Sequence, residues 1–173
     1  KGGCLLGWDV AKDVPWGILL LFGGGLAIAA GFGSSGLASW IGGQMSVLES
    51  VNFLLVILLA TGMVLFLTEI TSNTATATMI LPVLASLALA LDIHPFVLMV
   101  PAAMAANCAF MLPVGTPPNA IIFSTGKIKI IEMVRNGFWL NIIAMLLIVA
   151  AVYFLLPMLW GVDLTTYPDA FRD

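Results

Sequence analysis

The chain has 173 residues, of which 61% are hydrophobic and 9% are charged, and its mean hydropathy is +1.13. Because soluble domains carry roughly a quarter charged residues, this composition excludes an ordinary water-soluble domain and predicts an integral membrane protein. The formal net charge is −3, and without a basic patch the sequence offers no surface for a nucleic acid. Cys4 and Cys108 are too few and too far apart for a disulfide framework or a Cys-x-x-Cys site.

Five uncharged blocks divide the chain, at about residues 15–43, 50–68, 70–91, 93–126 and 136–162. Each approaches or exceeds the roughly 20 residues that a helix needs to cross a bilayer core. Since lipid offers the backbone no hydrogen-bonding partners, helices are the expected form. The blocks therefore predict an all-α, polytopic membrane protein.

The first block predicts a transmembrane helix over 15–43. It contains the triple Gly23-Gly24-Gly25, which lets another helix approach closely. The GFGSSG run at 31–36 is expected to bend or end this helix.

The basic residues predict how the blocks are oriented. Five of the six precede the first block or lie between the fourth and last blocks, at Lys1, Lys12, Lys127, Lys129 and Arg135. The positive-inside rule places both groups in the cytoplasm, so the second and third blocks together must leave and return to the outer face. Two full spans satisfy this requirement, and so does one hairpin that dips halfway into the membrane.

The joint between these two blocks, TEITSNTATAT (68–78), contains no Lys or Arg. A cytoplasmic turn usually carries some, which favours a re-entrant helical hairpin over 50–91 with its tip at 68–76.

The tip of such a hairpin offers two kinds of ligand at membrane depth. The helix that ends near Glu69 presents unpaired carbonyl groups, and the helix that follows presents unpaired N–H groups. Good N-cap residues are available there, namely Ser72, Asn73 and Thr74. Carbonyl and hydroxyl oxygens suit a hard cation, whereas N–H and hydroxyl donors suit a carboxylate. The alternative is that Thr76 and Thr78 bond back to their own helix, as threonines in spanning helices often do.

The fourth block predicts a broken helix over 95–126 with its break at 113–119. Pro117 and Pro118 supply no N–H group and disfavour helix in the residues before them. The carbonyl groups of about 110–114 are therefore expected to be free. Thr116 and Asn119 add side-chain oxygens, and Asn119 is expected to cap the helix that resumes. The alternative is a simple proline kink, which is common in membrane helices.

Two titratable residues need a separate interpretation. A carboxylate in the membrane is costly, so Glu69 is expected to have a partner, either a bound cation or a basic residue outside this chain, and to have a supporting role. His94 is expected to be an exposed residue of an outer loop.

The end of the chain predicts two elements. KIKIIEMVR (127–135) is expected to form a short amphipathic helix at the membrane interface, and 136–162 to form a spanning helix. An intramembrane enzyme is not expected, because the sequence offers no His/Asp/Glu cluster or aspartate dyad at membrane depth.

Two motifs, SNTATATMILPVL (72–84) and FMLPVGTPPNAIIFSTG (110–126), resemble the divalent anion/sodium symporter family, which includes sodium-coupled dicarboxylate and citrate transporters. The resemblance covers essentially the whole chain but only the second half of such a protein. It implies two inverted repeats, each with a hairpin bearing Ser-Asn-Thr and a broken helix. The chain has one Ser-Asn-Thr and no starting methionine, so it is expected to be the C-terminal repeat, partnered by an N-terminal repeat and by a second copy in a homodimer.

The resemblance also implies roles for particular residues. A substrate carboxylate would be bound by Asn73, Thr74, Thr116 and the backbone near Pro117. One sodium ion would be bound by Thr68, Thr71, Ser72, Asn73 and the carbonyl group of Gly115.

The implied function is sodium-coupled import of C4 dicarboxylates (succinate, malate, fumarate) across the cytoplasmic membrane by alternating access. No Lys or Arg lies near either break, so Na⁺ and helix N-termini would supply the positive potential for the anion. The alternatives are a sodium- or proton-coupled transporter of citrate or of an inorganic oxyanion, and a non-transporting membrane scaffold subunit.

Overall fold

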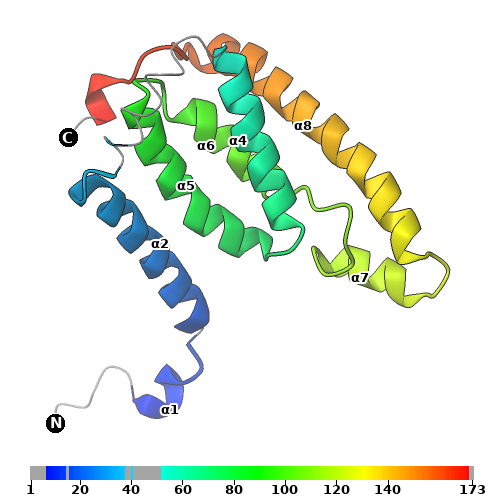
Figure 1. The fold of residues 1–173 in the computed structure, drawn as a ribbon. Helices are drawn as coiled ribbons and strands as arrows, with labels where there is room; N and C mark the ends of the chain where they lie inside the picture. Colours follow the sequence, from blue (N-terminus) through cyan, green and yellow to red (C-terminus); the bar gives the residue numbers. More distant parts are fainter. Residues whose placement is uncertain (1–6, 15, 38–39, 41–51, 172–173) are drawn as a thin grey trace.

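The computed structural model describes residues 7–14, 16–37, 40 and 52–171 (Figure 1). In these ranges all regular structure is helical, as the all-α prediction requires. The elements are α1 (Trp8–Ala11), α2 (Trp16–Ser34), α4 (Phe53–Thr68), α5 (Asn73–Ala90), α6 (Phe96–Ala105), α7 (Pro117–Ser124), α8 (Ile130–Trp160) and the short 3-10 helix η2 (Asp169–Phe171). The last part of the helix predicted over 15–43 and the first residues of the hairpin predicted over 50–91 lie outside the described residues.

Helices α4 and α5 are the two arms of a helical hairpin whose turn is formed by residues 69–72. Asn52 caps α4, because its Oδ1 accepts a hydrogen bond of 3.0 Å from the Leu54 N–H. The arms have 16 and 18 residues, which at 1.5 Å per residue is about 24 and 27 Å. By length and composition, α5 and α8 could each cross a membrane.

The hairpin lies in the middle of the bundle. Helix α4 packs against α6 and α8, while α5 packs against α6 and α2. Figure 1 shows α2 outside α5 on one side and α8 beyond α4 on the other. The hairpin turn and α7 lie toward the same end of the bundle.

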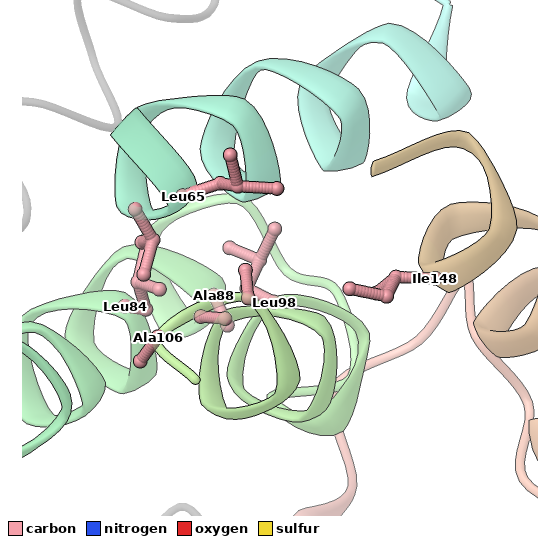
Figure 2. Close-up of a cluster of buried hydrophobic side chains, with 9 residues drawn as sticks. Leu65, Leu84, Ala88, Leu98, Ala106 and Ile148 are labelled. Carbon is pink, nitrogen blue, oxygen red and sulfur yellow. The ribbon is translucent and has the colours of Figure 1, made fainter. Parts of the chain in front are cut away.

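The core lies where α4, α5, α6 and α8 meet. Leu65 from α4, Leu84 and Ala88 from α5, Leu98 from α6 and Ile148 from α8 are all buried and in one cluster (Figure 2). In lipid, helices associate through close packing and not through exclusion of water, so these contacts stabilise the bundle mainly by dispersion.

A glycine of the predicted packing triple is where α2 meets α5. A Cβ atom on Gly25 would lie 2.5 Å from the Thr78 carbonyl oxygen, whereas Cβ atoms on Gly23 and Gly24 would meet nothing within 4 Å. Only the third glycine of the triple is therefore required by a contact among the described residues.

Three parts of the structure differ from the sequence prediction. Residues 130–160 form one helix, where we predicted an interfacial helix over 127–135 and a separate span over 136–162. The helix begins after Lys129, whose N–H donates to the Glu132 carboxylate, and Gly137 is a packing residue inside it and not a break.

The gap in the fourth block is wider than the predicted break at 113–119, because α6 ends at Ala105 and α7 begins at Pro117. His94 is 7% exposed and not a surface residue. Its ring contacts the rings of Phe96 and Phe171, so the C-terminal segment covers it.

Candidate functional site

The hairpin turn places a buried hydroxyl between two other oxygens. Thr68 ends α4, and its Oγ1 lies 2.8 Å from Asn73 Oδ1 and 2.7 Å from the Ala106 carbonyl oxygen. Because a hydroxyl carries one hydrogen, it can donate to only one of these acceptors at a time. Three converging oxygens of this kind are also the ligand type that hard cations prefer. The contact joins the hairpin to the end of α6.

The other threonines of the turn bond within the hairpin. The Thr71 hydroxyl donates to the Leu67 carbonyl at 2.8 Å and contacts the Thr76 hydroxyl. Thr76 and Thr78 donate to carbonyls four residues earlier, at 3.0 and 2.7 Å. The interpretation that these two residues bond back to their own helix is therefore confirmed.

Glu69 has a set of partners that the sequence prediction missed. Its side chain is 3% exposed. Oε1 accepts from the N–H groups of Phe110 (2.8 Å) and Met111 (3.0 Å) and from Asn141 Nδ2 (2.7 Å). Oε2 accepts from the N–H groups of Met111 and Leu112, both at 3.1 Å. The expected partner was a cation or a basic residue, but the donors are the backbone of the unwound segment and one amide.

This carboxylate accounts for the unwound chain at residues 110–112. Residues 106–116 form no α-helix, and the N–H groups at 110–112 bond to Glu69 and not to carbonyls one turn back. A buried N–H group without a partner is costly, so the carboxylate stabilises an unwound chain that would otherwise be unfavourable.

Asn119 supplies the matching donors for the carbonyl side of this segment. Pro113 has no N–H group to donate to the Ala109 carbonyl, and Asn119 Nδ2 donates to it instead, at 2.8 Å. The same Nδ2 donates to the Leu112 carbonyl at 3.1 Å. The prediction that Asn119 caps α7 was wrong. Thr116 is the N-cap, and its Oγ1 accepts from the Asn119 N–H at 3.4 Å.

Two glycines let the backbone come close around the break. A Cβ atom on Gly137 of α8 would overlap the Phe110 carbonyl oxygen and lie 2.6 Å from Met111 Cα. A Cβ atom on Gly115 would lie 2.9 Å from the Ala109 Cβ and 3.5 Å from the Glu69 carbonyl oxygen. Gly115 therefore lies beside the hairpin turn, and α8 lies directly against the unwound chain.

The residues predicted to bind ligands fall into two groups. Thr68, Thr71 and Asn73 are buried or half-buried at the hairpin turn, beside Gly115, whereas Ser72 and Thr74 are exposed at the start of α5. Thr116 and Pro117 line a cavity of about 420 Å³ together with Pro113, Val114, Ala120 and Phe123. Among the described residues, no hydrogen bond joins Ser72 or Thr74 to Thr116.

Two residues of α8 were missed by the sequence interpretation. Gly137 and Asn141 are four residues apart, so they share one helix face. A lone asparagine in an apolar span usually faces the protein interior, and a glycine one turn away permits close approach. That pair was the signal in the sequence for a contact with the break.

A helical hairpin and an interrupted helix that meet through buried polar groups are the construction used by many secondary membrane transporters. Residues 4–162 match the family described as the sodium:sulfate symporter transmembrane region, and the chain belongs to this family. The resemblance inferred from the motifs is thereby confirmed, and membership of a transporter family agrees with the prediction that the chain is not an enzyme.

The similar proteins are longer than this chain. It is 62% identical over 161 residues to the sodium-dependent dicarboxylate transporter SdcS of Staphylococcus saprophyticus subsp. saprophyticus, covering 93% of this chain and 31% of that protein. It is 58% identical over 160 residues to SdcS of Staphylococcus aureus, covering 92% and 31%. The chain thus spans about a third of the length of the curated relatives it matches.

Proposed function

We propose that this chain belongs to the C-terminal repeat of a sodium-coupled symporter that imports C4 dicarboxylates across the cytoplasmic membrane by alternating access. The relatives named above are sodium-dependent dicarboxylate transporters. The observation that carries the proposal is the convergence of the Thr68 hydroxyl, the Asn73 amide oxygen and the Ala106 carbonyl oxygen at the hairpin turn. The hairpin is proposed to be re-entrant, and the rest of the protein to supply the N-terminal repeat and a homodimer partner.

The donor set at the turn fits Na⁺. Hard cations take carbonyl, amide and hydroxyl oxygens, and the turn offers these without a cluster of His, Cys, Asp or Glu among the described residues. The proposed ligands are Thr68, Thr71, Ser72, Asn73 and Gly115, and we add the Ala106 carbonyl because it lies 2.7 Å from Thr68 Oγ1. Sodium here is a transported ion, and its binding would satisfy whichever of the two acceptor oxygens the single Thr68 hydrogen does not reach.

The substrate carboxylate is proposed to lie between the N-termini of α5 and α7. Helix N-termini carry about half a positive charge, and both helices begin after an extended N-cap residue, Ser72 and Thr116 respectively. The proposed contacts are Asn73, Thr74, Thr116 and the backbone near Pro117. Because residues 68–78 and 106–119 contain no Lys or Arg, the anion depends on Na⁺ for much of its positive potential, which couples the two binding events.

The test uses the full-length protein in proteoliposomes. Uptake of labelled succinate is measured with an inward Na⁺ gradient and with an equal K⁺ gradient. We expect uptake only with Na⁺, and competition by malate and fumarate. Absence of sodium-dependent succinate uptake would refute the proposal.

A second candidate is an inorganic oxyanion, because the family description names sulfate. Unlabelled sulfate or citrate that competes better than malate would favour that alternative. A scaffold role is tested with Asn73→Ala and Thr74→Ala, using Ser86→Ala on the same helix as a control, since the Ser86 hydroxyl bonds within α5. We expect the first two variants to lose uptake and the control to keep it.

A further inference from the structure

We propose that Glu69 and Asn141 are positioning residues, which hold the unwound segment 106–116 against the hairpin turn and thereby set the affinity for Na⁺ without touching the ion or the substrate. This inference rests on the proposed function. The observation behind it is the set of hydrogen bonds that Glu69 accepts from backbone N–H groups 41 to 43 residues later in the sequence.

Thr68 and Glu69 lie close to the unwound segment at three successive places and hydrogen-bond to it at the first two. At its start, the Thr68 hydroxyl lies 2.7 Å from the Ala106 carbonyl oxygen. In its middle, the Glu69 carboxylate accepts the N–H groups of residues 110–112. Near its end, a Cβ atom on Gly115 would lie 3.5 Å from the Glu69 carbonyl oxygen. The neighbouring residues Thr68 and Glu69 therefore lie beside both proposed sodium-ligand carbonyls, at 106 and 115.

The Glu69 carboxylate is fully used by these contacts. A carboxylate has about four lone-pair positions, and here its two oxygens take part in five donor contacts, from three backbone N–H groups and Asn141 Nδ2. No lone pair is left for a cation. Glu69 therefore acts on the sodium site without coordinating the ion, through the backbone that it orders and through its charge.

Asn141 orients this carboxylate from α8. Its side chain is fully buried, and Nδ2 donates to Glu69 Oε1 at 2.7 Å. Within the described residues, Asn141 Oδ1 is buried and has no hydrogen-bond partner. An unpaired buried oxygen destabilises a fold, so stability alone does not account for an amide at this position in an apolar helix. Its donor function toward Glu69 does.

The decisive variants keep volume and change hydrogen bonding. Glu69→Gln retains one acceptor oxygen but turns an NH₂ group toward N–H donors. Its control is Glu132→Gln, because Glu132 is exposed and its single bond, from the Lys129 N–H, can be accepted equally well by glutamine. Asn141→Leu removes the donor and, with it, the unpaired oxygen.

The experiment measures succinate uptake by the full-length protein in proteoliposomes as a function of Na⁺, together with the melting temperature of each variant. For Glu69→Gln we expect a sodium half-saturation concentration about tenfold higher, within the range of typical site-to-site couplings, with the maximal rate retained at saturating Na⁺. For Asn141→Leu we expect a rise of about threefold with an unchanged or higher melting temperature. Glu132→Gln is expected to match the wild type.

A purely structural role predicts a different result, namely less folded protein and a lower melting temperature with wild-type sodium half-saturation. That result, or failure of both variants to fold, would overturn the proposal. Either outcome is distinguishable from failure of the proposed function, because in that case the wild-type protein itself would have no sodium-dependent uptake.

Discussion

The two interruptions of regular helix in this chain satisfy their backbone groups in different ways. The hairpin turn at 69–72 is short, and the carbonyls of Leu67 and Ser72 accept from hydroxyl groups four residues later, on Thr71 and Thr76. The segment 106–116 depends on side chains from elsewhere, with Glu69 accepting from its N–H groups and Asn119 donating to its carbonyls. The turn is therefore locally encoded, whereas the longer break exists only when other helices are in place. Substitutions should separate the two.

Removing the carboxylate should have the largest effect on stability. Glu69→Ala leaves the N–H groups of residues 110–112 and the Asn141 amide without their acceptor. At about 1–3 kcal/mol for each of these four unsatisfied buried groups, we expect a loss of at least about 4 kcal/mol. The midpoint of unfolding of the detergent-purified protein measures it. A midpoint equal to that of Glu132→Ala would contradict this account of the break.

Adding one methyl group where α8 meets the same segment should have a smaller effect. Gly137→Ala places a Cβ atom on backbone atoms of Phe110 and Met111, which cannot rotate away. Overpacking of this kind costs about 1–3 kcal/mol. The melting temperature should fall for Gly137→Ala but not for Gly23→Ala, where a Cβ atom meets nothing within 4 Å.

Adding a methyl group between α2 and α5 should destabilise the protein less still, because two regular helices can shift apart as rigid bodies. Gly25→Ala brings a Cβ atom to the Thr78 carbonyl oxygen, while Gly24→Ala beside it meets open space. The gain in helix propensity of about 0.5–1 kcal/mol offsets part of the clash, so we expect a net loss of about 1 kcal/mol. Equal melting temperatures for the two variants would show that this helix crossing is not tight.

The smallest effect should be a pH dependence outside the membrane-spanning helices. Burial lowers the pKa of His94 below its ordinary value of 6.5, partly opposed by the nearby Asp163 carboxylate. The folded protein therefore binds this proton less readily than the unfolded chain, so stability is full above pH 6.5 and declines as the pH falls toward the lower folded value.

His94→Asn tests this dependence, because asparagine can still accept the Phe96 N–H, as His94 Nδ1 does at 3.2 Å, but does not titrate. We expect the melting temperature of the wild type to fall more than that of the variant between pH 7.5 and pH 5. Parallel curves for the two proteins would assign the acid sensitivity to other groups.

The features that could be predicted from the sequence are those that depend on local residue patterns. Apolar blocks predicted the helices, and the Pro117-Pro118 pair predicted an interruption before α7. The true extent of the break was not predictable, because the groups that stabilise it are backbone N–H groups, which every residue type except proline carries. The cost of burying Glu69 indicated that it needed a partner. Because most of its partners are backbone N–H groups, the residue types in the sequence do not show where those partners lie.

The hydroxyl-rich turn was a more favourable case. Ser72, Asn73 and Thr74 are unusual in an apolar chain, and they mark the start of α5 in the structure. The end of the chain was less favourable, since the basic segment and the span that follows share one helical pattern, and nothing local distinguishes one helix of 31 residues from two.

The most direct test of the account compares two threonines of α4. Thr68 and Thr61 are both fully buried, but Thr61 donates to the Ile57 carbonyl within its own helix, at 2.6 Å, whereas Thr68 contacts Asn73 and Ala106. The measurement is the sodium dependence of succinate uptake by the full-length protein carrying Thr68→Val or Thr61→Val. We expect the sodium half-saturation concentration to rise about tenfold or more for Thr68→Val, within the range of typical couplings, and to stay at the wild-type value for Thr61→Val. Equal sodium half-saturation in the two variants would contradict a sodium site at the hairpin turn.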